Sequence, residues 1–154
     1  MKLLLLLTSS LVFMTLTHSA TPGSDSPCEG RDVSLDQFRW NNRILVIFAG
    51  DSTQDTYRDQ MDLLKSHNDG VLDRDLVIFS IFDNQCSLLG DETISDASAR
   101  EIRKKLSPVT SYSIYLIGKD GGVKLKKDQI LEVGELFSVI DSMPMRQREM
   151  RDGS

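Results

Sequence analysis

The segment from Tyr112 to Met143 constrains the fold most, because its pattern predicts two strands, a tight turn and a helix in that order. The apolar run 114–117 ends at Gly118, and Asp120-Gly121 then supplies the positive-φ residues that a two-residue hairpin turn needs. The strand 123–126 alternates apolar residues with lysines, as a half-solvated strand near a sheet edge does. Apolar residues then recur at helical spacing up to Pro144, which ends the helix: Val133, Leu136, Phe137, Ile140 and Met143.

Two further strands precede this segment and are predicted to be buried on both faces. The runs 44–49 and 76–82 are continuously apolar or nearly so, and the helix predicted between them favours a parallel pairing. Asp51, Ser52 and Thr53 supply a cap for that helix, which is expected to stop at residues 68–70. The polar stretch 83–95 is predicted to be a loop. A shorter helix, marked by Ala99, Ile102 and Leu106, is predicted to begin behind Ser95 or Asp96 and to end before Ser107-Pro108. The order βαβαββα predicts an α/β three-layer sandwich around a mixed four-stranded sheet.

Residues 1–20 have the pattern of a secretory signal peptide, with Lys2 followed by a short apolar core and small or polar residues. We therefore expect a secreted, extracellular protein with no membrane span after cleavage. The remaining chain divides into a flexible arm (21–34), one domain (35–145) and a polar C-terminal tail (146–154). Its 23 acidic residues outnumber the 17 basic ones left after Lys2 is removed, which argues against a nucleic-acid partner.

Four segments resemble a known family. The strand order is similar to that of the thioredoxin fold over residues 44–143. FRWNNRILVIFAG, RDLVIFSI, LIGKDGGVKL and IDSMPMR resemble an uncharacterised thioredoxin-like domain-of-unknown-function family. That family occurs in small secreted proteins and as repeats in coiled-coil domain-containing protein eighty and sushi-repeat-containing extracellular proteins. The resemblance implies a thioredoxin-like fold and an extracellular setting, and no established reaction.

The chain departs from thioredoxins where their chemistry resides. The position that holds two catalytic cysteines in thioredoxins, between the first strand and first helix, reads Gly50-Asp51-Ser52-Thr53. The position of their cis-proline falls near Ser113, and Pro108 lies too far upstream to match. Both parts of a disulfide-exchange site are therefore missing.

Cys28 and Cys86 are the only cysteines, and an even pair in an oxidising compartment predicts a disulfide bond between them. The alternative is catalytic: Cys86 acts as a peroxidatic or exchange thiol, and Cys28 resolves it. A reactive thiol needs a helix N-terminus or a cation nearby. The residues close to Cys86 in sequence, Asp83, Asp91 and Glu92, are acidic instead and argue against that role.

Two surfaces are candidates for partner binding. The tail carries Arg146, Arg148 and Arg151 and is the most basic short segment of the chain, although a frayed, solvated terminus is the simpler interpretation. Trp40, together with Arg39 and Arg43, is the second candidate, and the alternative is that its ring covers one edge of the core. No metal site and no cofactor are predicted, since one histidine and two distant cysteines make a poor zinc site.

These observations predict a secreted thioredoxin-like binding or structural module without the thioredoxin redox centre. Its expected partner is an extracellular or matrix protein. The alternative is a thiol-dependent oxidoreductase, similar to peroxiredoxins, that uses Cys86 with Cys28. An acid-dependent hydrolase is a third reading, for which no carboxylate pair can be identified.

Overall fold

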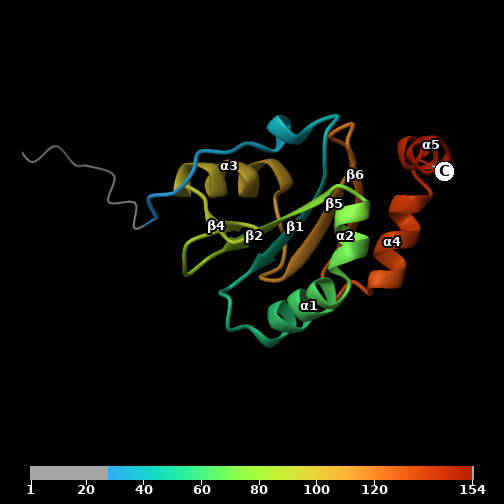
Figure 1. The fold of residues 1–154 in the computed structure, drawn as a ribbon. Coiled ribbons are helices and arrows are strands. Elements are labelled where there is room, and N and C mark those ends of the chain that lie inside the picture. The colour runs from blue at the N-terminus through green and yellow to red at the C-terminus, as the bar shows by residue number, and fades with distance from the viewer. Residues whose placement is uncertain (1–27, 154) are drawn as a thin grey trace, which may run out of the picture.

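The computed structural model describes residues 28–153, which form one six-stranded sheet between two layers of helices (Figure 1). The strands have the order β4-β3-β2-β1-β5-β6. β1 and β2 are parallel, and all other neighbours are antiparallel. The strands are β1 (Arg43–Ala49), β2 (Leu76–Phe82), β3 (Leu88–Leu89), β4 (Glu92–Thr93), β5 (Ser113–Ile117) and β6 (Val123–Lys127).

The helices cover both faces of this sheet. One face carries α1 (Asp55–Ser66), α2 (Asn68–Asp73) and α4 (Val133–Asp141), and the other carries α3 (Asp96–Leu106) and the short 3-10 helix η1 (Leu35–Phe38). Alternate residues of β1 enter the two cores: Leu45 and Ile47 pack with α1 and α4, whereas Val46 and Phe48 pack toward α3. All seven residues of β1 are buried, as predicted for a central strand covered on both faces.

The predicted three-layer thioredoxin-like architecture is confirmed, but the sheet has six strands rather than four. The two extra strands, β3 and β4, lie in the stretch predicted to be a polar loop. Leu89 pairs with Phe79 and Leu88 with Ser80, so this short hairpin covers the otherwise open edge of β2. Strands of two residues are too short to show an alternating pattern in the sequence.

The helix α1 ends at Ser66, close to the stop predicted at residues 68–70, but a second helix that was not predicted, α2, begins at Asn68 and runs through Gly70. A Cβ atom at Gly70 would lie 2.5 Å from Cε2 of Phe137 on α4, so this glycine permits close helix packing instead of ending a helix. Within residues 28–153, none of the helices combines the length and the apolar composition needed to cross a bilayer.

The turn between β5 and β6 also differs from the prediction. Gly118 N donates to Gly122 O and Gly121 N donates to Gly118 O, both at 2.9 Å. A left-handed conformation was predicted for both Asp120 and Gly121, but of these two residues only Gly121 (φ +82°) adopts it. The connection is therefore longer than a two-residue turn, and it matches a three-residue hairpin loop closed by a left-handed glycine.

The tail is not frayed. Residues Pro144–Asp152 form helix α5, which begins with proline at its first position, where the missing N–H costs nothing.

Candidate functional site

The loop between β1 and α1 is held by hydrogen bonds among its own residues and to Gln85. Asp51 Oδ1 accepts hydrogen bonds from Thr53 Oγ1 (2.6 Å) and Thr53 N (2.8 Å), which together lower the pKa of Asp51. Ser52 donates from its hydroxyl (3.0 Å) and its amide (3.2 Å) to Gln85 Oε1. The predicted cap is wrong, since the N-cap residue is Gln54, whose side chain makes no capping bond. The polar groups here tie the loop after β1 to the loop after β2.

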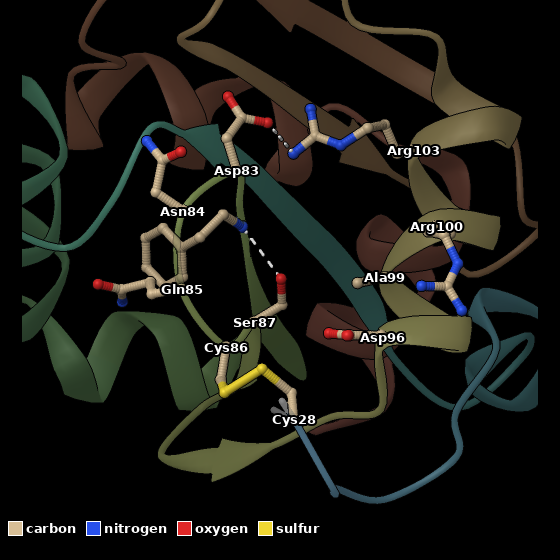
Figure 2. Close-up of a pocket in the computed structure, with 11 residues that line it drawn as sticks. Cys28, Asp83, Asn84, Gln85, Cys86, Ser87, Asp96, Ala99, Arg100 and Arg103 are labelled. Carbon is tan, nitrogen blue, oxygen red and sulfur yellow. Dashed lines mark hydrogen bonds and ion pairs between the residues drawn. A yellow bond between two sulfur atoms is a disulfide. The ribbon is translucent and has the colours of Figure 1, made fainter. Parts of the chain in front are cut away.

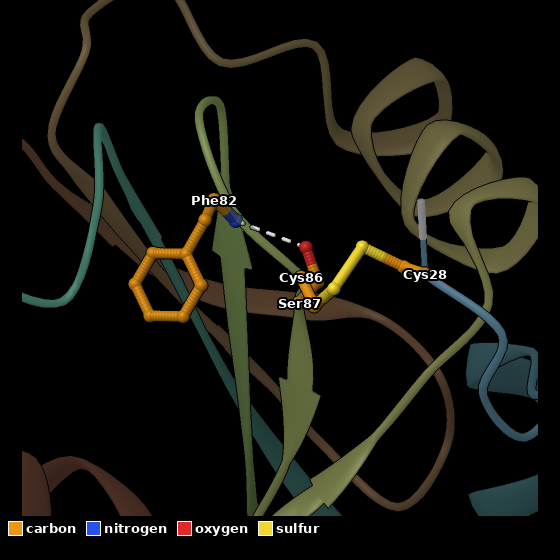
Figure 3. The surroundings of a disulfide bond; sticks show 4 residues. All are labelled: Cys28, Phe82, Cys86 and Ser87. Carbon is orange, nitrogen blue, oxygen red and sulfur yellow. Dashed lines mark hydrogen bonds between the residues drawn. A yellow bond between two sulfur atoms is a disulfide. The ribbon is translucent and has the colours of Figure 1, made fainter. Parts of the chain in front are cut away.

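The two cysteines are joined to each other at the far end of that second loop (Figure 3). The Cys28–Cys86 disulfide has a Cα–Cα distance of 5.4 Å, within the usual range for such bonds. Cys28 is buried, and Ser87 Oγ accepts a 3.0 Å hydrogen bond from Phe82 N, which fixes the backbone beside Cys86. As a disulfide, Cys86 has no thiolate with which to attack peroxide.

The described part of the N-terminal arm is bonded to the domain, so the prediction of a flexible arm is wrong for residues 28–34. Arg31 N donates to Thr93 O (3.0 Å), and Val33 N donates to Ser98 Oγ (2.8 Å) at the start of α3. Gly30 passes so close to β4 that a Cβ atom there would lie 2.5 Å from Thr93 O. The signal peptide and residues 21–27 of the arm lie outside the described residues.

A pocket of about 580 Å³ opens beside the disulfide, between the loop after β2 and helix α3 (Figure 2). The disulfide forms one wall, and the charged side chains lie mostly on α3. The polar and charged lining residues are Asp83, Asn84, Gln85, Ser87, Asp96, Arg100 and Arg103.

Two arginines give this pocket a different electrostatic character from the one expected. Arg103 Nη2 lies 2.8 Å from Asp83 Oδ1, and its guanidinium carbon lies 5.1 Å from the centre of the Phe48 ring. Arg100 is exposed at the same rim, whereas Asp91 and Glu92 are not among the lining residues. The acidic surroundings predicted for Cys86 are therefore only partly correct.

These arginines are absent from the sequence around Cys86, because they are contributed by helix α3. The signal that reveals them is the spacing of Asp96, Arg100 and Arg103, which places all three on one face of α3. Across residues 28–153, no three His, Cys, Asp or Glu side chains are grouped as metal ligands.

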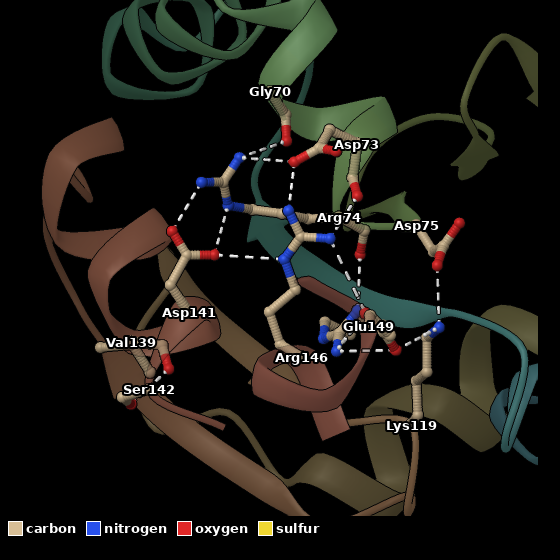
Figure 4. Close-up of polar contacts among 11 residues, drawn as sticks. Gly70, Asp73, Arg74, Asp75, Lys119, Val139, Asp141, Ser142, Arg146 and Glu149 are labelled. Carbon is tan, nitrogen blue, oxygen red and sulfur yellow. Dashed lines mark hydrogen bonds and ion pairs between the residues drawn. The ribbon is translucent and has the colours of Figure 1, made fainter. Parts of the chain in front are cut away.

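Arg146, predicted to bind a partner, is instead buried in an ion-pair network under α5 (Figure 4). Its Nη1 donates to Asp73 O (2.8 Å), its Nη2 pairs with the Asp73 carboxylate, and its Nε lies 3.4 Å from Asp141 Oδ1. Arg148 and Arg151 are exposed on the same helix and remain available to a partner.

The network continues from α5 into the sheet. Arg43, the first residue of β1, donates from Nη2 to both carboxylate oxygens of Glu149 (3.1 and 3.2 Å), and Lys119 Nζ lies 2.8 Å from Glu149 and from Asp75. Burial acts to raise the pKa of Glu149, but the bonds from Lys119 and Arg43 outweigh it and the pKa is lowered.

Asp141 is the second acidic residue that accepts hydrogen bonds from two arginines of the network, Arg74 and Arg146. Arg74 donates to its two oxygens at 3.0 and 2.6 Å, and the Arg74 guanidinium stacks on the Phe137 ring at 4.1 Å. Burial opposes ionisation of Asp141, but the hydrogen bonds from Arg74 and then Arg146 lower its pKa.

Trp40 does not cover the edge of the core, because 62% of its surface is exposed. Its backbone has φ +69°, a conformation that bulky residues rarely adopt, and its N–H donates to Lys119 O at 2.7 Å. The Arg39 guanidinium lies 5.7 Å from the indole centre. The bond to Lys119 places Trp40 beside the network that anchors α5.

Residues 34–149 match the family described as "Domain of unknown function (DUF4174)". The chain belongs to this family. The resemblance proposed from four sequence segments is thereby confirmed.

Relatives of this family member are much longer proteins. Human sushi repeat-containing protein SRPX is 26% identical over 147 residues, a match covering 87% of this chain and 32% of SRPX. Coiled-coil domain-containing protein 80 from Danio rerio is 29% identical over 134 residues, covering 75% of this chain and 15% of that protein. The chain thus spans about a third or less of each relative.

Solved structures of two thioredoxin-fold proteins are similar to this domain. The reduced 2-Cys peroxiredoxin of Plasmodium vivax has a TM-score of 0.55 at 14% identity, with 75% of this chain and 84% of that chain covered. Thioredoxin peroxidase I of Plasmodium yoelii has the same TM-score at 16% identity, with coverages of 79% and 82%. At these identities the similarity shows the fold alone.

The four family-like segments meet in the ion-pair network. FRWNNRILVIFAG contributes Arg43, RDLVIFSI contributes Arg74 and Asp75, LIGKDGGVKL contributes Lys119, and IDSMPMR contributes Asp141 and Arg146. The segments that carry the family resemblance therefore build the end of the sheet that lies away from the disulfide pocket.

Proposed function

We propose that this protein is a secreted, non-catalytic thioredoxin-like module that binds an extracellular or matrix protein. One observation carries the proposal: both cysteines of the chain are bonded to each other, and neither lies between β1 and α1, the position where a thioredoxin keeps its reactive pair. Secretion is supported by the signal-peptide pattern of residues 1–20 and by the extracellular setting that the family resemblance implies.

The surface proposed for binding is formed by Trp40 and the exposed arginines of α5, Arg148 and Arg151. The backbone strain at Trp40 holds a large aromatic ring in solvent, and such strain is concentrated at functional positions. Exposed Trp and Arg are the residue types that contribute most to protein interfaces. We call Trp40, Arg148 and Arg151 the tryptophan surface.

The test is retention on cell-deposited extracellular matrix. We expect Trp40→Ala and the double variant Arg148→Ala/Arg151→Ala each to lower the retained fraction severalfold. Val109→Ala is the matched control, since Val109 is 80% exposed and lies before β5, at the opposite end of the sheet. Equal retention of all variants, or no retention of the wild type, would reject the proposal.

The alternative, a thiol-dependent oxidoreductase, is favoured by one feature: Cys86 is partly exposed beside a pocket that contains Arg100 and Arg103. In such an enzyme an incoming thiolate would attack Cys86 Sγ, form a mixed disulfide and release Cys28 as the thiolate. Peroxide consumption or disulfide reduction, abolished by Cys86→Ser, would establish this activity and displace the non-catalytic proposal.

A further inference from the structure

The strand β6 is an edge of the sheet: it pairs with β5, and no strand of residues 28–153 lies on its other side. The backbone hydrogen bonds that the described chain makes outside its helices and strands do not involve residues 123–127 either. The amides and carbonyls on the outer side of β6 are therefore open to another strand. At the opposite edge of the sheet, β4 has only two residues and offers far less backbone for pairing.

The register of β5 and β6 shows which side chains of the edge strand face α3. Lys126 lies opposite Tyr115, and its Nζ lies 5.1 Å from the centre of that ring. Val123 lies opposite Ile117, and both β5 partners belong to the core under α3. Lys124 is the extra residue of the β-bulge between them. Val123 is 52% exposed although it is apolar, and Lys126 is exposed as well. A strand added to β6 would place alternate side chains beside these two residues.

A small pocket of about 170 Å³ lies on the same face, next to Val123. Four elements, η1, α3, β5 and β6, contribute its apolar lining: Leu35, Leu106, Ile117 and Val123. Its charged lining residues, Asp36 and Lys105, are paired with each other at 3.1 Å. An apolar cavity of about this size accommodates a group as large as benzene. Because directly opposite residues of paired strands are in contact, one apolar side chain opposite Val123 would reach this pocket.

The lysines of β6 select the charge of such a strand. Lys124 is paired with Asp120 (2.6 Å) and Lys127 with Glu135, whereas Lys126 has no carboxylate partner among residues 28–153. An acidic side chain opposite Lys126 would supply that partner, and a basic one would be repelled.

The same lysines argue against a second copy of this chain as the added strand. Two antiparallel β6 strands paired along their whole length would place Leu125 opposite Leu125, and Lys124 opposite Lys126 on both sides of it. Like charges directly opposite each other are destabilising. Charge complementarity therefore favours an acidic partner strand.

We propose that β6 binds an extended acidic segment of a partner protein, which adds to the sheet as a further strand. Two residues apart, the segment would carry a carboxylate beside Lys126 and a large apolar side chain in the pocket beside Val123. Main-chain hydrogen bonds would provide the affinity, and these two side chains the specificity. This is a second binding surface, and the inference does not depend on the tryptophan surface proposed above.

The probe is a short capped peptide, Thr-Thr-Glu-Thr-Leu-Thr, titrated into the purified protein with its disulfide intact and followed by amide chemical shifts. We expect saturable shifts at residues 123–127. Two N-methylated versions, one methylated on the Glu and Leu amides and one on the threonine amides between and after them, test the main-chain bonds. Alternate amides of a strand point to opposite edges, so one version should lose binding and the other should keep it. Equal binding of both versions, or shifts confined to other residues, would overturn the proposal.

A charge exchange localises the binding to Lys126. The wild type should bind the peptide at least about threefold more tightly than a version with Lys in place of Glu, and Lys126→Glu should reverse this preference. Lys65→Glu is the matched control, because it makes the same change of charge at an exposed position on α1 and should keep the wild-type preference. An unreversed preference in Lys126→Glu would contradict the assignment. Dimerisation of the wild type through residues 123–127, without peptide binding, would show that a second copy covers the edge and would also overturn it.

Discussion

Arg43 and Glu149 are 106 residues apart in the chain and are joined by two hydrogen bonds, of 3.1 and 3.2 Å, between the first residue of β1 and the last helix. Because the Arg43 side chain is only 1% exposed, its charge depends on this carboxylate for compensation. Lys119 shares the same carboxylate. One acidic side chain of α5 therefore bonds to two cations, Arg43 at the start of β1 and Lys119 in the β5–β6 turn, and Asp75 supplies a second carboxylate to Lys119.

We predict that Glu149→Gln lowers the free energy of unfolding by about 2–3 kcal/mol, because it leaves Arg43 and Lys119 short of a charged acceptor. Urea unfolding measures the change. Glu101→Gln, at an exposed position on α3, is the control and should change stability by less than about 0.5 kcal/mol. A similar small loss in both variants would show that α5 contributes little to the stability of the domain.

Stability should also fall on acidification through this network. The folded-state pKa values of Asp141 and Glu149 lie below their unfolded values. Their stabilising contribution is therefore complete above the unfolded pKa values and is lost as the pH falls through the folded ones.

The stability difference between wild type and Glu149→Gln should accordingly be constant above about pH 5 and shrink below about pH 4. Unfolding curves at a series of pH values test this. A difference that stays constant down to pH 3 would mean that ionisation of Glu149 is not linked to folding.

Removing the disulfide with the double variant Cys28→Ser/Cys86→Ser should destabilise the domain by up to about 4 kcal/mol, the idealised entropy of a loop this long. The cysteines are 58 residues apart. Because residues 30–33 keep their bonds to β4 and α3, we expect the arm to stay docked. Amide exchange of Arg31 and Val33 measures docking; rapid exchange in the variant would show that the covalent bond alone holds the arm.

Two glycine substitutions should have opposite effects. Gly121→Val should cost more than about 1 kcal/mol, since Gly121 has φ +82° and a Cβ atom there would lie 3.0 Å from Arg39 Nε. Gly134→Ala, in the first turn of α4 with open space around it, should raise stability by a few tenths to about 1 kcal/mol. Thermal unfolding distinguishes the two, and a Gly121→Val protein as stable as the wild type would contradict the left-handed turn.

The sequence was most informative where a short pattern of residue types is compatible with only one secondary structure. The continuous apolar runs predicted β1, β2 and β5, and the segment around Asp120-Gly121 predicted the hairpin, although not its exact loop. Gly70 was predicted to end a helix but lies within α2. A glycine that ends a helix and one that lets two helices approach closely look the same in sequence. Its neighbour Phe137 is known only from the tertiary structure.

The candidate sites were harder to predict because they depend on pairing across long distances in the chain. Arg146 and Arg148 are two residues apart in one basic segment, yet the first is buried against Asp73 and the second is exposed. Likewise, nothing local to Cys86 indicates that Arg100 and Arg103 share its pocket. Burial and partner choice are properties of the packed domain, not of the segment.

The positions of the arm and of α5 have a consequence for longer proteins that contain this domain. The arm reaches the sheet beside β4 and α3, whereas α5 is bonded to the start of β1 and to the β5–β6 turn, and Figure 1 shows the two on opposite sides of the molecule. Segments attached before and after the domain would therefore be separated by the body of the domain. Because the arm is fixed by a covalent bond and α5 by ion pairs, that separation would be rigid, and the domain would act as a spacer that sets the distance between its neighbours.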